Sequence, residues 1–301
     1  MTPATLTYEP IVVSKIINRV QNMPFRWSIN PYRGCTHRCI YCYARPTHAY
    51  LGFDDPSQFD RHIFVKENAV TALRRQLSHP SWRREEIVIG TVTDPYQPAE
   101  AKFRLTRAVL EVLLEYRNPV SITTKSPLVC RDLDLLVALS AATACTVNFS
   151  IATLDPAVWR VIEPGAPHPR QRLRALATLR ATGIRAGVLL APVLPGLTDR
   201  GDRLEAVVRA AVDHGACFVE PLVLRLPSGV REWCLAQLAS THPHLAAAYA
   251  RHYRTANAPT RYVRRIQRRV ADLLERLGAA VEPRRHRQTL PLRYEQLQLP
   301  C

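Results

Sequence analysis

The chain has 301 residues, of which 47% are hydrophobic and 22% charged, a composition that is typical of a globular protein and excludes a disordered one. No apolar run approaches the roughly 20 residues of a membrane-spanning helix, and residues 1–10 lack the basic flank and apolar stretch of a secretory signal. We therefore expect a cytoplasmic protein with no membrane partner.

The formal net charge is +16, because 41 basic residues stand against 25 acidic ones. The excess is uneven, since residues 251–293 contain 12 arginines and three acidic residues, a net charge of +9. Such a basic segment suits the phosphates of a nucleic acid. A solvated arginine face would give the same composition, so nucleic acid is an open partner at this point.

Hydrophobic periodicity predicts alternating helices and strands along most of the chain. Helices are predicted over residues 67–78, 104–116, 133–141, 171–182 and 204–213. Buried strands are predicted over residues 85–92, 119–124, 145–152, 185–194 and 216–224. Short strands that alternate with amphipathic helices are typical of parallel βα units, so the sequence predicts an α/β fold.

Beyond about residue 228 the strand pattern stops, and helices are predicted over residues 231–239 and 260–277. The second helix combines an apolar stripe with an arginine-rich surface. We predict three parts of the chain: an N-terminal arm of residues 1–23, a core of residues 24–228, and a basic helical C-terminal extension of residues 229–301.

Three of the eight cysteines, Cys35, Cys39 and Cys42, form a C-x3-C-x2-C triplet. Thiolates at this spacing can converge on one metal centre, but three ligands are too few to close a tetrahedral zinc site. A 4Fe–4S cluster is held by thiolates, and three of them would leave the fourth iron open. We therefore favour an iron–sulfur cluster over a zinc ion completed by His37.

The triplet, with an aromatic residue just before its last cysteine, resembles the signature of the radical S-adenosylmethionine superfamily. The strings NPYRGCTHRCIYCYARPTHAYLGF (30–53) and GTVTDPYQPAE (90–100) are similar to a bacterial subgroup related to spore photoproduct lyase. The resemblance extends from about residue 14 to residue 226. It implies an incomplete (β/α)6 barrel of the TIM type, with polar strand ends that meet at the mouth of the barrel.

The resemblance also implies roles for individual residues. The three cysteines would ligate three irons, and the fourth iron would chelate S-adenosylmethionine. Tyr41 would lie near the adenine, Thr93 and Asp94 near the methionyl amino group, Lys125 near the methionyl carboxylate and Ser150 near the ribose. One-electron reduction of the sulfonium would give methionine and a 5′-deoxyadenosyl radical that abstracts hydrogen. An electron donor such as flavodoxin or ferredoxin would be needed.

Each of these residues also has a purely structural interpretation. Tyr41 could be a core aromatic, and Thr93 and Asp94 could form a turn before a proline. Lys125 could be an exposed loop amine, and Ser150 could satisfy a backbone group. Two further sets of charged residues are not expected to contact the cofactor. Arg160, Glu163 and Arg172 are expected to form a salt-bridged surface. The second set comprises the cations around the cluster, which could raise its reduction potential or dock an acidic electron donor: His37, Arg38, Arg45 and His48.

One departure from the lyase concerns the residue three positions before Asp94. The lyase has a cysteine there that returns hydrogen to the product radical, whereas this chain has Thr91, whose O–H bond is too strong for that role. The substrate therefore stays open, and no catalytic residue or oligomeric state is assigned. The alternatives are a lyase-like DNA repair enzyme and a non-catalytic nucleic-acid-binding metalloprotein.

Overall fold

The computed structural model describes residues 5–279 and residue 282. Within them, the central sheet has seven strands in the order β10 (Val219–Val223), β9 (Arg185–Val193), β8 (Cys145–Ser150), β7 (Val120–Thr124), β6 (Ile87–Ile89), β3 (Trp27–Ile29) and β2 (Ile17–Arg19). Neighbouring strands from β3 to β10 are parallel, and only β2 is antiparallel to its neighbour. The predicted incomplete (β/α)6 barrel is confirmed.

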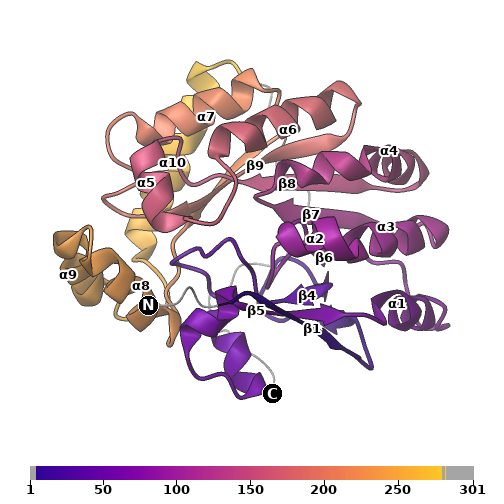
Figure 1. Cartoon of the computed structure of the whole chain (residues 1–301). Helices are drawn as coiled ribbons and strands as arrows, with labels where there is room; N and C mark the ends of the chain where they lie inside the picture. The colour runs from indigo at the N-terminus through magenta and orange to yellow at the C-terminus, as the bar shows by residue number, and fades with distance from the viewer. Residues whose placement is uncertain (1–4, 280–281, 283–301) are drawn as a thin grey trace.

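Helices pack along the outer side of this curved sheet, as Figure 1 shows. They are α1 (Ala69–Leu77), α2 (Pro98–Phe103), α3 (Leu105–Glu115), α4 (Leu133–Ala142), α5 (Pro156–Ile162), α6 (Pro169–Ala181) and α7 (Arg203–Asp213). Most of the predicted helices lie within two residues of these bounds. The short helices α2 and α5 were not predicted, because each offers too few turns for a clear periodicity.

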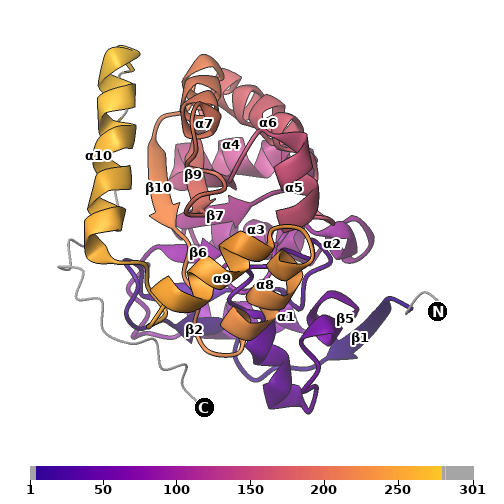
Figure 2. The ribbon, with the colours of Figure 1, turned by 90° about the vertical axis from the view of Figure 1, so that its left-hand side faces the viewer.

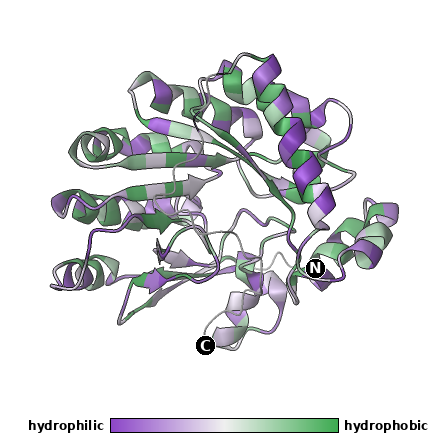
Figure 3. Ribbon diagram, turned by 180° about the vertical axis from the view of Figure 1, so that it is seen from behind, coloured by the Kyte–Doolittle hydropathy of each residue, from purple (hydrophilic) through white to green (hydrophobic). Residues whose placement is uncertain are grey.

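The core lies between the sheet and these helices. All three residues of β6 are buried, and the apolar faces of α3 and α7 pack against the same cluster. Figure 3 shows the strands of the central sheet mostly in hydrophobic colours. Some buried positions of the strands are polar and bond across the sheet: the Asn148 side-chain NH2 group donates to Ser121 Oγ at 2.9 Å and to the Ile122 carbonyl at 2.8 Å.

A second, three-stranded sheet was not predicted. It has the order β1 (Thr7–Ile11), β5 (His62–Lys66) and β4 (Tyr32–Arg33), and the short 3₁₀ helices η1 (Arg45–Leu51) and η2 (Pro56–Asp60) lie between β4 and β5. The predicted arm of residues 1–23 thus places one strand in each sheet. A third 3₁₀ helix, η3 (Pro127–Asp132), follows β7.

The C-terminal part is helical, with α8 (Val230–Ala239), α9 (Pro243–His252) and α10 (Thr260–Arg276). Figure 2 shows α8 and α9 as a pair and α10 lying along β10, the last strand of the sheet. The apolar stripe of α10 joins the main core through Ile266, Val270 and Leu273. Part of the predicted extension, residues 280–281 and 283–301, lies outside the described residues. No helix in the described part of the chain is long and apolar enough to cross a bilayer.

Candidate metal and cofactor site

The cysteine loop, residues 35–42, lies beside the carboxyl ends of the parallel strands and is fixed by backbone hydrogen bonds. The Cys35 amide donates to the Phe59 carbonyl at 2.9 Å, and the Ile40 amide donates to the Ile162 carbonyl at 3.1 Å. The loop also packs closely on Gly165, where a Cβ would lie 2.2 Å from the carbonyl oxygen of Thr36. The loop is therefore shaped by η2 and by the segment after α5.

All three thiols of the triplet are free and close enough for their charges to interact. Cys35 and Cys39 are each 8% exposed. Burial raises the pKa of all three thiols, and it raises that of Cys39 to about 12. Among the described residues, no three Cys, His, Asp or Glu side chains converge closely enough to hold a single metal ion.

The segment after β6 is tied to the cysteine loop by its side chains. Thr93 Oγ1 donates to the Gly34 carbonyl at 2.6 Å, and Gln97 Nε2 donates to the same carbonyl at 2.9 Å. Gln97 Oε1 accepts a hydrogen bond from the Thr36 amide at 3.1 Å. Thr93 is therefore part of the support for the triplet, and Gln97 is a second supporting residue, whose role no motif in the sequence indicates.

Asp94 connects the ends of two strands. Its carboxylate accepts hydrogen bonds from Thr124 Oγ1 and the Lys125 amide, both at 2.7 Å, and from the Tyr96 amide at 2.9 Å. Burial raises its pKa, but His37, whose Nδ1 lies 3.3 Å away, and these hydrogen bonds outweigh burial and lower the pKa to about 2. Asp94 is therefore an anion at neutral pH, and it forms a turn as well.

A buried chain of charged groups also lies close to the triplet. The Tyr41 hydroxyl donates to Glu163, and Glu163 pairs with Arg172 at 2.5 Å. Burial raises the pKa of Glu163, but the charges of Arg172 and Lys125 lower it further than burial raises it. The Lys125 ammonium lies 5.8 Å from the centre of the Tyr41 ring.

The interpretation of Glu163 and Arg172 as surface residues is wrong. The two residues are 1% and 0% exposed, and of the three only Arg160 is exposed. Arg172 also donates to the Ser150 carbonyl at 2.8 Å, while Ser150 Oγ donates to the Ala191 carbonyl at 2.9 Å. Arg172 thus connects Ser150 to the group around Tyr41.

The structure therefore brings four of the five predicted cofactor residues around the triplet and connects the fifth, Ser150, through Arg172. Lys125 illustrates the electrostatics of this group. Burial lowers the pKa of Lys125, but the charges of Cys39 and Glu163 more than offset burial and raise it. Lys125 is consequently a cation that faces the triplet from the end of β7.

Of the other cations expected around the cluster, Arg45 and His48 are buried and Arg38 is exposed. Arg45 is 1% exposed, donates to the Cys39 carbonyl at 3.1 Å and pairs with Asp60 at 2.8 Å. His48 is buried among aromatic rings and bonds to the His62 carbonyl.

Thr91, in the position of the lyase cysteine, has a structural partner. Its hydroxyl and its backbone amide are both hydrogen-bonded to the Asn30 side chain. Its carbonyl accepts a hydrogen bond from the half-exposed Tyr43. Asn30 therefore fixes the start of the segment that carries Thr93 and Asp94.

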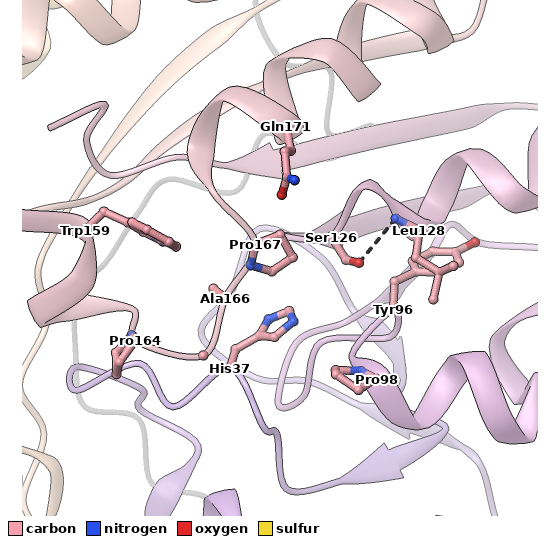
Figure 4. A pocket seen from close by; sticks show the side chains of 11 residues that line it. His37, Tyr96, Pro98, Ser126, Leu128, Trp159, Pro164, Ala166, Pro167 and Gln171 are labelled. Atoms are coloured by element: carbon pink, nitrogen blue, oxygen red, sulfur yellow. Dashed lines mark hydrogen bonds between the residues drawn. The ribbon is translucent and has the colours of Figure 1, made fainter. Parts of the chain in front are cut away.

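A cavity of about 430 Å³ lies beside the cysteine loop (Figure 4). His37, Tyr96, Ser126, Trp159 and Gln171 line it, together with Pro164 and Pro167. None of the five predicted cofactor residues lines it. The cavity thus lies next to the cysteine loop, and its walls include Ser126, the neighbour of Lys125 in the chain.

Comparisons with known proteins identify the family of this chain. The Radical SAM superfamily matches residues 29–209. An uncharacterized protein of Mycobacterium tuberculosis is 38% identical over 283 residues, which are 93% of this chain and 83% of that protein. A Pseudomonas phage M6 protein, named a radical SAM Nalpha-GlyT isomerase, is 26% identical over 57% of this chain and 34% of its own.

The solved structure of spore photoproduct lyase complexed with dinucleoside spore photoproduct has a TM-score of 0.66 and 14% identity to this chain. The superposition covers 91% of this chain and 80% of that one, and at this identity the likeness concerns the fold. The chain belongs to the radical SAM superfamily of enzymes and shares the fold of spore photoproduct lyase.

Proposed function

We propose that Cys35, Cys39 and Cys42 hold a 4Fe–4S cluster and that the chain cleaves S-adenosylmethionine reductively beside it. The observation that carries the proposal is three free, neighbouring thiols, two buried and one half-buried, with the charges of Asp94 and Lys125 close to them. A cluster bound there supplies the electron that splits the sulfonium into methionine and a 5′-deoxyadenosyl radical, which abstracts hydrogen from a substrate.

The donor set fits a multi-iron cluster better than a single zinc ion. The three thiols lie near one another without converging on one point, and no fourth ligand joins them within the described residues. The raised pKa values of the thiols are those of the metal-free loop. Metal binding deprotonates thiols and releases their protons, so these values do not oppose a cluster.

The surrounding residues match the two charged ends of an amino acid. The Lys125 ammonium would pair with the methionyl carboxylate, and the anionic Asp94 region would face the methionyl ammonium. Both charges are partly or fully shielded from water, which strengthens each pairing. Tyr41, held by Glu163, would present its ring near the adenine, and Ser150 would lie near the ribose.

For the substrate, we propose a nucleic acid. The N-terminal half of α10 carries four exposed arginines and no acidic residue, and these are Arg261, Arg264, Arg265 and Arg268. Like charges three or four residues apart destabilise a helix, so phosphates that neutralise them would be bound favourably. The solved lyase structure contains a dinucleoside photoproduct, which fits this class of substrate. With Thr91 bonded to Asn30 in place of the lyase cysteine, photoproduct repair by the lyase route is the less favoured reaction.

The test is anaerobic reconstitution with iron and sulfide, followed by dithionite, S-adenosylmethionine and chromatography for 5′-deoxyadenosine. We expect the product from the wild type and none from a C35A/C39A/C42A variant. Zinc binding without a cluster would refute the proposal and favour a non-catalytic nucleic-acid-binding protein. Conversion of photoproduct in ultraviolet-treated oligonucleotides would instead favour the lyase-like repair reaction.

A further inference from the structure

A second hollow, of about 270 Å³, opens on the outer side of the cysteine loop. Four segments meet there: the loop itself, η2, the end of α5 and α8. Residues from these segments line it, among them Arg38, Ile40, Asp60, Arg61, Trp233 and Gln237. Arg38 and Ile40 stand between the cysteines of the triplet, so the hollow adjoins the backbone that carries the thiols.

The rim of this hollow is positively charged. Arg38 and Arg61 line it, and Arg160 precedes the lining residue Val161; all three arginines are exposed. None of the three forms an ion pair with another described residue, whereas the nearby Asp60 is already paired with Arg45 at 2.8 Å. The other acidic group of η2, Asp55, accepts hydrogen bonds from Ser57 and caps that helix. Among the described charged residues that line the hollow, only Arg38 and Arg61 are therefore unpaired.

A short path of contacts leads inward from the hollow. The guanidinium carbon of Arg45 lies 4.6 Å from the centre of the Trp233 ring, which lines the hollow. Arg45 Nη2 and Nε donate to the Cys39 carbonyl at 3.1 and 3.3 Å. A molecule seated in the hollow would thus be separated from a cluster ligand by two packed side chains.

We propose that this hollow docks an acidic, one-electron donor protein of the flavodoxin or ferredoxin type. The inference rests on the proposed function, which needs one electron for each sulfonium cleaved. The donor would lose one electron and the cluster would gain it, and no atom passes between the two proteins. Arg38, Arg61 and Arg160 would steer and seat the acidic partner, since charges at the rim of an interface govern encounter and specificity.

The arginines of α10 are a poor alternative for this role. That helix packs against α7 and β10 at one edge of the central sheet, and none of its residues lines the hollow. Electron transfer weakens steeply with distance, so a donor bound on α10 would be badly placed. The α10 arginines therefore provide a control surface of the same charge.

The test compares two reductants on the reconstituted enzyme. An Arg61→Glu/Arg160→Glu variant is driven either by a bacterial flavodoxin with its NADPH-dependent reductase or by dithionite, and 5′-deoxyadenosine is measured. An Arg264→Glu/Arg268→Glu variant carries the same change in charge on α10. Binding of the flavodoxin is measured separately by calorimetry at low ionic strength.

We expect the Arg61/Arg160 variant to lose at least tenfold in flavodoxin-driven rate and in flavodoxin affinity, with the dithionite-driven rate unchanged. The α10 variant should keep its flavodoxin affinity, and added salt should slow only the flavodoxin-driven reaction of the wild type. Equal losses with both reductants, an unchanged flavodoxin-driven rate, or an equal loss of flavodoxin affinity in the α10 variant would overturn the inference. If the wild type forms no deoxyadenosine with dithionite, the proposed function fails and the inference fails with it.

Discussion

Replacement of Arg172 with methionine tests the buried ion pair on which the proposed cofactor side of the site depends. Arg172 donates one hydrogen bond to Glu163, one to the Ser150 carbonyl and two to the Pro167 carbonyl. Removal of one partner from a buried pair costs about 3–5 kcal/mol. The charge of Lys125 still favours the Glu163 carboxylate, which places the expected loss near the lower end. By the usual entropy of unfolding, a loss of about 3 kcal/mol lowers Tm by roughly 6–12 °C.

The same variant should show a characteristic pH dependence. In the wild type the pKa of Glu163 is lowered, so its stabilisation is present above the unfolded value and is lost as pH falls through the folded value. Without Arg172, burial favours the protonated form of Glu163. The free energy of unfolding of the variant therefore rises relative to that of the wild type as pH falls. Urea unfolding should therefore show that the difference in free energy of unfolding between the wild type and the variant is smaller at pH 5 than at pH 8. A Glu163→Leu/Arg172→Met variant should lose less than the sum of the two single losses. A gap below about 1 kcal/mol at pH 8, or one that is constant with pH, would refute this reasoning.

Three further outcomes are expected. Gly165→Ala should at least halve the iron bound after reconstitution, because its Cβ would lie 2.2 Å from a carbonyl oxygen of the cysteine loop. The control Gly183→Ala, whose Cβ would have no neighbour within 4 Å, should keep full iron content. Lys66→Met should raise the free energy of unfolding by about 1–3 kcal/mol at pH 7, since burial lowers the Lys66 pKa to about 8. This gain in stability should become smaller between pH 8 and about 10.5, because the stability of the wild type rises over that range. Arg264→Gln/Arg268→Gln should weaken binding of a DNA oligonucleotide and reduce its salt slope by about 1 for each phosphate that is no longer neutralised, as titrations at several salt concentrations would show.

Long periodic elements could be predicted from the sequence with close bounds. The last helix was predicted over residues 260–277 and is observed at Thr260–Arg276, because its apolar stripe and its glycine stop are both local signals. The strand predicted over residues 85–92 is shorter, Ile87–Ile89, since Gly90 leaves the strand with a φ of 91°. The first parallel strand, Trp27–Ile29, was missed, because three residues are too few for a period of two to show.

At the site, the motif residues could be predicted, but their partners could not. Asp94 lies in the motif GTVTDPYQPAE and was interpreted either as a cofactor residue or as a turn residue. Its carboxylate accepts a hydrogen bond within the turn, from the Tyr96 amide, and another from the end of the next strand, at the Lys125 amide. Glu163 and Arg172 lie on different elements and meet only after folding, so no spacing in the sequence announces their pairing. Arg45 likewise looked like a free cation, whereas Asp60 and the Cys39 carbonyl satisfy it in the core.

The position of α10 along β10 has a consequence for how the chain can be shortened. A strand at the end of a sheet presents unpaired backbone groups that invite pairing with another copy, and natural folds cover such edges. Here the covering element is the last described helix, whose Ile266, Val270 and Leu273 are buried against the core. A chain cut before Thr260 would expose both the edge of β10 and an apolar strip of the sheet. Such a fragment should aggregate even though it keeps every cysteine of the triplet.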